Sequence, residues 1–526
     1  MKKKYIGILF ILLISIAGLI YWMETVFSVS YSFVKVKTAG DISLQIFLPR
    51  GDYKIIEKEN EAEERPIFGA DSRQLEVIKA GDTVGDLIFE GILLPGSDDF
   101  YYFLKYSPRI DDETPLEFHV KVNAKSKEVT ERHILYDYDQ LKQEPVLTIP
   151  NSIWTEPAVI ASGYGLPKQA LFIDGEDFSM HLNMVNVYEP LENGVRKERF
   201  DLTQPIQYLA DKQKQEFIIS FPQVAGTEIE QWGIIGKEGM VNWGDEEQEN
   251  ILLVANLDRV RKWTQGGVQY VTPETYYPYD PRAFWVVPAQ HVGNKLLLEG
   301  NNRFSTNFAR LALQAALRTQ TEGGYWISSP RSTWLYGDYG IDAGFYDTRF
   351  NTDAGLFLLH GYREFGEEAY LQGALRYGDF LIEYAGTHHH KTKNDGYLVY
   401  DYTHGGDMDR KTETLTSLNH LITEMNFLYE LYKDTDEKRY LYTAEKMRQA
   451  VKDTASYWKK DDGDLWYAYL PDGSYGLQDY PLLTLKDLRY SQRMIQEIYG
   501  DKDMDFQYLI DVKESYLTAR GLPLYD

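Results

Sequence analysis

Cysteine is absent from this sequence, which excludes disulfide bonds, thiolate catalysis and cysteine-ligated metals. The chain also lacks the Gly-x-Ser-x-Gly element of serine hydrolases, a phosphate-binding glycine loop and the His-Glu-x-x-His motif of zinc hydrolases. Basic residues are in deficit, because 55 Lys and Arg stand against 80 Asp and Glu and leave a formal net charge of −25. Phosphate binding needs a basic surface, so nucleic acid is excluded as a partner. No sequence feature calls for a cofactor.

Two sets of residues invite a metal interpretation. They are His388-His-His390 and the group Asp401, His404, Asp407 and Asp409. Three adjacent histidines cannot all face one ion, and the Asp spacing does not fit a calcium loop with Gly at position six and Glu at position twelve. We therefore interpret both as polar loop residues and predict no metal site.

Tyrosine, in contrast, is abundant, with 41 residues against 24 Phe and 10 Trp. Its flat apolar face and hydroxyl suit a sugar-binding groove, although most tyrosines in any protein are packing residues. The acidic balance fits poorly with a polyanionic glycan as substrate. A local basic groove inside the acidic surface would reconcile the two.

The N-terminus predicts a membrane anchor over residues 1–29. Met1-Lys2-Lys3-Lys4 precedes the uncharged run Tyr5–Met23, which at helical rise is just long enough to cross a bilayer. Lysines before the run and Glu24 after it place the N-terminus in the cytoplasm and the bulk of the chain outside. A cleaved signal peptide is the alternative, but no small-x-small cleavage site follows the run. We expect an uncleaved single-pass anchor in the cell membrane.

Two β-rich regions follow. Within 30–144, Ile42–Leu48 and Glu117–Val122 alternate between apolar and polar residues, and turn clusters separate the runs, which predicts a β-sandwich-like domain. Prolines between 145 and 157 resemble a linker, and we assign 145–290 to this linker and a second β-rich domain.

The region 291–526 changes to helical periodicity and repeats itself. Phe357–Val451 aligns with itself at a shift of 70 residues without a gap, so that Tyr362 falls on Tyr432 and Tyr370 on Tyr440. A fixed period of this kind indicates stacked helical hairpins, because one hairpin alone cannot bury its apolar face. We predict an incomplete α/α toroid, with a straight solenoid as the alternative and the oligomeric state left open. The expected helices lie at about 303–318, 350–365, 367–385, 413–433, 436–458, 483–499 and 502–518.

Three long segments return the chain from an outer helix to the next inner one. They are 323–349, 397–410 and 463–481, and they are rich in aromatic, Gly and Asp residues. Long loops in a compact helical domain are uncommon unless they form a site. In a toroid all three lie on one rim. Because the motifs of serine and zinc hydrolases are absent, tyrosine, carboxylate and arginine side chains remain as the candidates for chemistry.

These segments resemble the C-terminal domain of the D-glucuronyl C5-epimerases over about 320–500. Gly323-Gly-Tyr-Trp326 is similar to the family's Gly-Gly-Trp-Pro element, and Gly344-Phe-Tyr346 to its Pro-Gly-Trp-Tyr. Ser417-Leu-Asn-His420 is similar to its Val-Leu-Asn-Gly helix start. Trp466-Tyr467 and Tyr480-Pro-Leu resemble its final Ile-Tyr and Tyr-His segments, where the family carries catalytic tyrosines.

The sequence also departs from the family pattern. The family's Met-Ala-Gln-Gly is Arg349-Phe-Asn-Thr-Asp353 here, the His after the last Tyr is Pro481, and an insertion around Gly405-Gly406 displaces the Glu-Tyr-Pro element. The resemblance therefore supports the fold more than the activity.

The resemblance implies an isomerase that inverts glucuronic to iduronic acid at C5 within an acidic polysaccharide. Such a reaction needs a base on one face, a proton donor on the other and a cation for the carboxylate. The implied catalytic residues are Tyr467 and Tyr480, with Tyr402 third. The implied substrate-binding residues are Arg331 and Arg349 for the carboxylate, Trp334 for stacking on a sugar ring, Tyr346 and Asn419.

Two other interpretations remain open from the residues. The first is a glycoside hydrolase or lyase on a similar toroid, with acid and base chosen from Asp338, Asp347, Asp353 and Asp401. The second is a non-catalytic surface protein that binds glycan or protein through its β domains.

Overall fold

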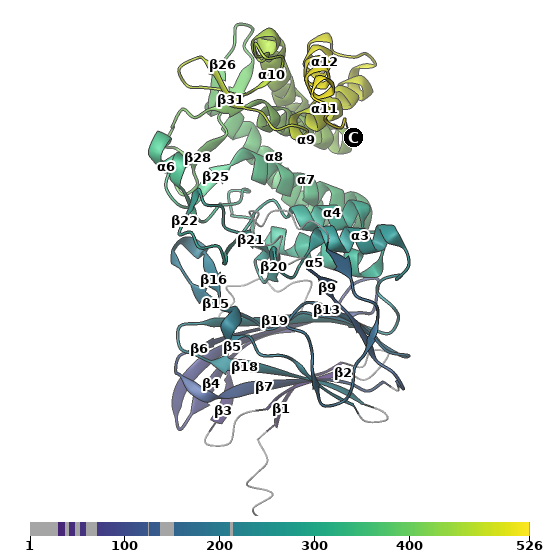
Figure 1. Ribbon diagram of the computed structural model, residues 1–526. Coiled ribbons are helices and arrows are strands. Elements are labelled where there is room, and N and C mark those ends of the chain that lie inside the picture. Colours follow the sequence, from purple (N-terminus) through teal and green to yellow (C-terminus); the bar gives the residue numbers. More distant parts are fainter. Residues whose placement is uncertain are drawn as a thin grey trace, which may run out of the picture. The chain divides into compact units, whose positions relative to one another are not determined.

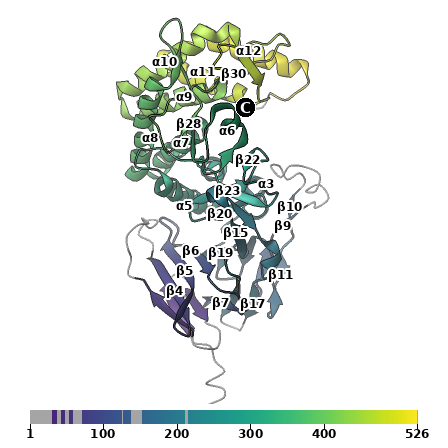
Figure 2. The same ribbon diagram turned by 90° about the vertical axis from the view of Figure 1, so that its left-hand side faces the viewer.

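The computed structural model describes residues 30–36, 42–47, 53–58, 71–124, 126–136, 152–210 and 214–524 (Figures 1 and 2). The predicted membrane anchor at 1–29 lies outside them. Within the described part of the chain, no helix combines the length and apolar character needed to cross a bilayer. The chain divides into two compact units. The β unit comprises Met1–Pro190, Arg196–Val260 and Asn302–Phe304, and the helical unit comprises Leu191–Val195, Arg261–Asn301 and Ser305–Asp526.

Two antiparallel sheets build the β unit. The first has the order β1 (Ser30–Val36), β2 (Ile42–Phe47), β7 (Asp112–Val122), β18 (Gln215–Gln223), β17 (Gln207–Ala210) and β12 (Tyr164–Gly165). The second contains, in order, β11 (Ala158–Val159), β8 (Thr130–Arg132), β13 (Leu171–Asp174), β14 (Ser179–Leu182), β19 (Glu228–Gly236), β15 (Asn186–Pro190) and β16 (Arg196–Glu198). A meander of β3 (Tyr53–Glu57), β4 (Asp71–Lys79), β5 (Asp82–Leu93) and β6 (Phe100–Pro108) joins β19.

The two sheets share one apolar core. Every second residue of β18 is buried, and Phe217, Ile219 and Phe221 pack in the same cluster as Leu87 and Phe89 of β5. Strands from the two regions 30–144 and 145–290, which we expected to form separate domains, build these sheets together, because β7 pairs with β18 and β6 with β19. Long-range pairing of this kind leaves no signal in the local sequence pattern. The remaining elements of this unit are β9 (Ile134–Leu135), β10 (Ile153–Trp154) and α3 (Glu246–Ala255).

Helical hairpins build the second unit. They pair α4 (His291–Glu299) with α5 (Arg303–Thr319), α7 (Thr348–Phe365) with α8 (Glu368–Thr387), α9 (Leu418–Thr435) with α10 (Lys438–Thr454) and α11 (Leu483–Tyr499) with α12 (Met504–Ala519). The bounds agree with the predicted helices to within a few residues, whereas α4 and the short α6 (Thr333–Tyr339) were not predicted. Left-handed residues end several helices, among them Gly366 after α7 and Asp436 after α9.

The hairpins form an inner and an outer layer. The inner helix α9 contacts both α7 and α11, and every residue from Leu418 to Leu431 is buried. Close approach of the layers requires glycine at 355, because a Cβ there would lie 2.6 Å from the Tyr377 ring. Figure 2 shows the hairpins following a curve. This layering is that of an incomplete α/α toroid rather than a straight solenoid.

Short strands connect the return segments along one rim of the helical unit. β25 (Phe345–Asp347) pairs with β28 (Tyr402–His404), which joins the first segment to the second. β29 (Thr416–Ser417) pairs with β30 (Trp466–Tyr469), which brings the third segment alongside. The further strands of this unit are β20 (Arg261–Thr264), β21 (Gly267–Val271), β22 (Tyr276–Tyr277), β23 (Ala283–Val286), β24 (Arg331–Ser332), β26 (His389–Lys391), β27 (Tyr397–Val399) and β31 (Tyr475–Gln478).

Candidate active site

A wide cleft lies where the three return segments meet the first turns of the inner helices. Its volume is about 1200 Å³, which exceeds the 300–1,000 Å³ typical of a site for one small ligand. Aromatic side chains form much of its wall: Tyr276, Trp334, Tyr339, Phe350, Tyr402, Tyr467 and Tyr480. Ionisable side chains complete it: His291, Asp338, Asp347, Arg349, Asp353, His420 and Asp472. Long helical loops therefore build a single site, as their lengths predict.

Six of the eight residues that the family resemblance implies line this cleft. They are Trp334, Arg349, Tyr402, Asn419, Tyr467 and Tyr480. Their positions span 146 residues of sequence, from 334 to 480, and the strand pairs β25–β28 and β29–β30 bring them together.

Arg331 and Tyr346 do not line the cleft, which corrects their implied role in substrate binding. The Arg331 guanidinium pairs with Asp342, with Nε 2.5 Å from Oδ1, and lies over the Tyr336 ring. Tyr346 is fully buried, and its hydroxyl lies 3.2 Å from that of Tyr377. Alternation along β25 explains the second case, because Tyr346 points away from the face on which its neighbour Asp347 meets the cleft.

Asp347 caps the N-terminus of α7, where its carboxylate accepts a hydrogen bond from the Phe350 amide at 3.0 Å. The side chain is 5% exposed. Burial raises the pKa of Asp347 to about 7, although amide donors of the first helical turn oppose the shift. A carboxyl group with this pKa can donate a proton near neutral pH and accept it again.

Arg349 lies in the cleft wall but is already paired with two carboxylates. Its Nε lies 3.1 Å from Asp353, and its Nη1 donates to Asp487 at 2.6 Å and to the Asn419 carbonyl oxygen at 3.4 Å. These carboxylates hold the pKa of Arg349 above its usual range despite burial. Asp353 and Asp487 therefore already pair with the guanidinium that would have to bind the carboxylate of a uronate substrate.

The three predicted catalytic tyrosines stand close together. The rings of Tyr467 and Tyr480 are 5.6 Å apart and nearly perpendicular, and Tyr402 packs edge-on against Trp334 at 5.2 Å. Burial raises the pKa of all three phenols, and nearby carboxylates raise it further. They are hence protonated at neutral pH and act as hydrogen-bond donors rather than bases.

Asp401 lies behind the cleft wall and has a structural role. It is fully buried and accepts hydrogen bonds from the Ser417 amide at 3.0 Å and the Ser417 hydroxyl at 2.6 Å. The neighbouring His420 bonds through Nδ1 to the Thr348 hydroxyl at 2.9 Å. These bonds join β29 and the starts of α7 and α9. Of the four predicted hydrolase carboxylates, Asp347 and Asp353 thus lie inside the cleft, Asp338 at its exposed edge and Asp401 behind it.

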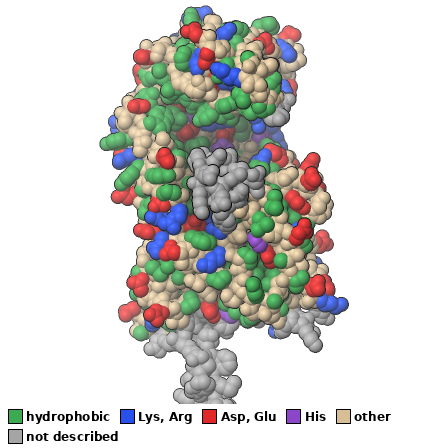
Figure 3. Space-filling model, in the orientation of Figure 1, with side chains coloured by type: hydrophobic (Ala, Val, Ile, Leu, Met, Phe, Trp, Pro, Cys, Tyr) green, Lys and Arg blue, Asp and Glu red, His purple; other side chains and the backbone are tan. Residues whose placement is uncertain are grey.

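The cleft wall is acidic, and the basic groove that a polyanionic substrate would need is not there. Arg349 is the one Lys or Arg among the described residues that line it. On the face of the molecule that Figure 3 displays, acidic and basic side chains are interspersed.

Several cleft residues escaped the sequence-based prediction. Tyr276 belongs to the aromatic stretch before the first helix, so its composition offered a signal. Tyr339 and Asp472 belong to the return segments 323–349 and 463–481, so their segments were predicted to form a site although the two residues were not singled out. His291 had no distinguishing pattern and reaches the cleft because the fold brings α4 to the same rim.

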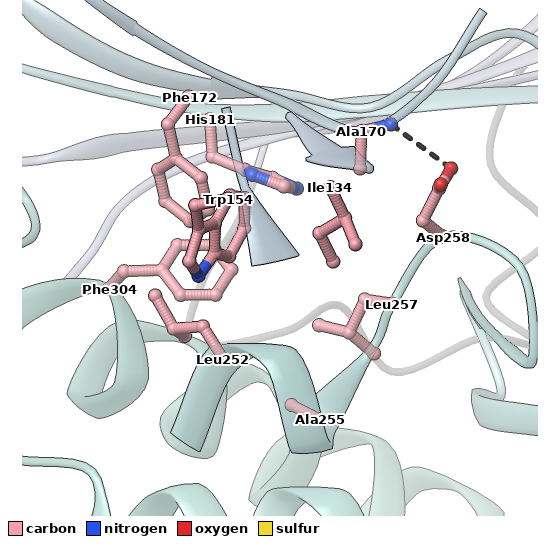
Figure 4. Close-up of a pocket in the computed structure, with 10 residues that line it drawn as sticks. All are labelled: Ile134, Trp154, Ala170, Phe172, His181, Leu252, Ala255, Leu257, Asp258 and Phe304. Atoms are coloured by element: carbon pink, nitrogen blue, oxygen red, sulfur yellow. Dashed lines mark hydrogen bonds between the residues drawn. The ribbon is translucent and has the colours of Figure 1, made fainter. Parts of the chain in front are cut away.

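The β unit contains a separate, much smaller cavity of about 20 Å³ (Figure 4). His181 lies in its wall among aromatic side chains, 4.8 Å from the Phe172 ring and 4.7 Å from Phe304. Neither ring nitrogen of His181 has a hydrogen-bond partner among the described residues. Burial lowers the pKa of His181 to about 3, so the ring is neutral and packs as an aromatic group. No predicted site residue lies here.

No family model matches the sequence, and no curated protein is significantly similar to it. Among solved structures, a family 76 glycoside hydrolase (mannosidase) from Bacteroides thetaiotaomicron is 16% identical, covers 46% of this chain and 64% of its own and has a TM-score of 0.34. A family 76 glycoside hydrolase from a bovine strain of that species is 12% identical over 77% of this chain and 76% of its own, at a TM-score of 0.36. A cellobiose 2-epimerase from Bacillus thermoamylovorans is 11% identical, covers 44% of this chain and 59% of its own and has a TM-score of 0.32.

These three structures are carbohydrate-active enzymes. The chain spans less than two thirds of the length of the first mannosidase, at 64%. TM-scores of this size do not identify an activity, and the geometry of the cleft has to supply the functional hypothesis.

Proposed function

We propose that the protein is a glycan-modifying enzyme that cleaves glycosidic bonds in this cleft by acid–base catalysis. The observation that supports this is Asp347, a buried carboxyl group with a pKa of about 7 at the wall of an aromatic cleft. A glycosidase needs one carboxylic acid that is still protonated at working pH to protonate the leaving oxygen. Aromatic side chains on the cleft walls supply stacking surfaces for sugar rings.

Asp353 is the candidate for the second carboxylate. It lines the same cleft from α7, the helix that Asp347 caps. A glycosidase needs such a second carboxylate as base or nucleophile beside the acid. Arg349 donates a hydrogen bond from Nε to Asp353 at 3.1 Å and thereby orients that carboxylate.

A uronate C5-epimerase, which the family resemblance implies, is the second candidate. The convergence of Tyr402, Tyr467 and Tyr480 in one cleft favours it. Against it stand the raised pKa of each phenol and the two carboxylates that already pair with Arg349. The hydrolase needs neither a tyrosinate nor a free arginine.

One assay separates the two candidates. The full chain is incubated in D₂O with neutral, amino-sugar and glucuronate-containing oligosaccharides. New reducing ends that Asp347→Asn abolishes support the hydrolase. Deuterium at C5 of a hexuronic acid, lost in Tyr467→Phe or Tyr480→Phe but with no new reducing ends, supports the epimerase and overturns the hydrolase.

We further propose that the helical unit works outside the cell, tethered by the apolar run Tyr5–Met23. The charge distribution around this run supports the orientation, with lysines on one side and Glu24 on the other. Fractionation of cells that express the full chain tests this. The protein should remain in the membrane fraction after a high-salt wash. It should also be degraded when protease is added to intact cells from which any cell wall or outer membrane has been removed.

A further inference from the structure

The charge and hydrogen-bonding character of the cleft wall determine which glycan it can accept. Resting on the proposed function, we infer that the substrate is a glycan with free amino groups, that is, a chain containing de-N-acetylated hexosamine. A protonated amine combines positive charge with hydrogen-bond donors, and the wall offers negative charge and acceptors.

Two buried polar atoms in the cleft wall lack a partner. Asn419 Oδ1 and Ser332 Oγ have no hydrogen-bond partner among the described residues, and the side chains are 2% and 1% exposed. Leaving such atoms unpaired is unfavourable, so a native site normally supplies a partner when it is occupied. Asn419 Oδ1 can only accept a hydrogen bond, so the group that satisfies it has to be a donor.

Carboxylates determine the charge of the wall. Asp338 and Asp472 lie at its exposed edge and Asp353 lies inside, while Asp353 and Asp487 together exceed the charge of Arg349. His420 does not offset this charge, because burial lowers its pKa and keeps it neutral at neutral pH. His291 is exposed and lies 3.8 Å from Asp353. The cleft therefore repels carboxylated glycans and attracts cationic ones.

Aromatic faces favour the same ligand. Trp334 and Tyr480 are partly exposed in the wall, Tyr480 to 52%. An ammonium group is attracted to the face of such a ring, most strongly to that of Trp, whereas a carboxylate is not. The cleft volume of about 1200 Å³ has room for several sugar rings, so that more than one amino group can face the acidic wall at once.

Binding to a catalytically disabled protein tests the inference separately from the reaction. The full chain carrying Asp347→Asn is titrated calorimetrically with glucosamine, N-acetylglucosamine, glucose and glucuronate-containing oligomers of equal length. We expect the glucosamine oligomer to bind about tenfold or more tightly than the N-acetylated one at low salt. The advantage should shrink as salt rises, because the edge carboxylates are exposed.

Paired variants locate the effect. The double variant Asp338→Asn/Asp472→Asn should lose most of the preference for the glucosamine oligomer. The control double variant Glu322→Gln/Asp461→Asn changes the net charge by the same amount outside the cleft and should retain that preference. Equal or tighter binding of the acetylated, neutral or glucuronate oligomer overturns the inference. Tight glucosamine-oligomer binding without cleavage by the unmodified chain would overturn the hydrolase instead and leave the substrate class standing.

Discussion

Burial of single ionisable groups gives the cleft its chemistry. Asp347 is a common N-cap residue by sequence, and only its enclosure raises its pKa to about 7. Arg349 shows the limit of sequence-based prediction at this scale. Its partner Asp353 is four residues away and could be foreseen, but Asp487 is 138 residues away, on α11. The orientation of Tyr346 was also beyond the sequence, because it depends on alternation in the three-residue strand β25.

Asp347→Asn should lower the rate of glycan cleavage by about 10²–10⁴-fold, the usual contribution of a general acid. Asparagine retains helix capping, so the fold should persist. In the unmodified enzyme, activity should decline as pH rises through about 7, because the acid loses its proton. A pH–rate profile and circular dichroism check both statements; an unchanged rate in the variant contradicts the assignment.

The same residue makes stability depend on pH. The pKa of Asp347 is raised in the folded state, so the folded chain binds more protons than the unfolded chain between about pH 4 and 7. Stability therefore falls as pH rises through this window. Asp347→Asn should be more stable than the unmodified chain above pH 7, by about 2–4 kcal/mol. Urea unfolding at pH 5 and pH 8 measures the difference, which should fall to less than half at pH 5 if the pKa is the cause.

The helical hairpin is the element that the sequence predicts best. Its period of 70 residues is visible without structural knowledge, because apolar positions recur wherever the inner and outer layers meet. The short strands β25, β28, β29 and β30 could not be foreseen. They contain two to four residues each, which is too few for an alternation of apolar and polar residues to be recognised. They form because segments distant in the sequence pair with each other.

Packing between inner and outer helices predicts a sharp difference between two glycines. A Cβ at Gly355 would lie 2.6 Å from Tyr377 and 3.0 Å from Phe427, so Gly355→Ala should destabilise the protein by about 1–3 kcal/mol. At Gly386, on α8, an added Cβ would have no neighbouring atom within 4 Å, so Gly386→Ala should be neutral or stabilising by up to about 1 kcal/mol. Thermal unfolding of both variants tests the layering; equal effects would contradict it.

A buried ion triad ties α12 to the segment that carries Tyr480. Lys513 is fully buried, and its Nζ lies 2.7 Å from both Asp464 and Asp479. Lys513→Met leaves two buried carboxylates without a cation and should cost about 3–5 kcal/mol. Adding Asp464→Asn and Asp479→Asn should recover part of that loss. Chemical denaturation of the single and triple variants measures it; a triple variant that is less stable than the single one would contradict the pairing.

At the scale of the whole molecule, net charge is the property that can be read most directly from the sequence. The formal net charge of −25 already opposes anionic partners, and the structure adds that the cleft contains no compensating basic groove among its described residues. Composition could not show this, because 55 Lys and Arg are enough to build such a groove if the fold gathers them. The pairing of the sandwich sheets across 30–144 and 145–290 was likewise beyond local pattern.

The whole-molecule field leads to a prediction about polyanions. A glucuronate-containing polymer should bind the full chain only weakly, with a Kd above about 1 mM at low salt, because the protein and the cleft wall are both negative. Isothermal titration at low and physiological salt checks this. Tight binding that weakens as salt rises would contradict it and would restore the uronate epimerase as the first candidate.

The strand pairs along the rim have a consequence for how this cleft could be remodelled. Because β25 bonds to β28 and β29 to β30, the backbone of each return segment is part of the support of the next. A loop transplanted alone would arrive without its pairing partner and displace residues that belong to a different hairpin. We expect substrate specificity to be transferable between proteins with this arrangement only in grafts that move neighbouring return segments together. A pair of segments, and not a single loop, would therefore carry the specificity.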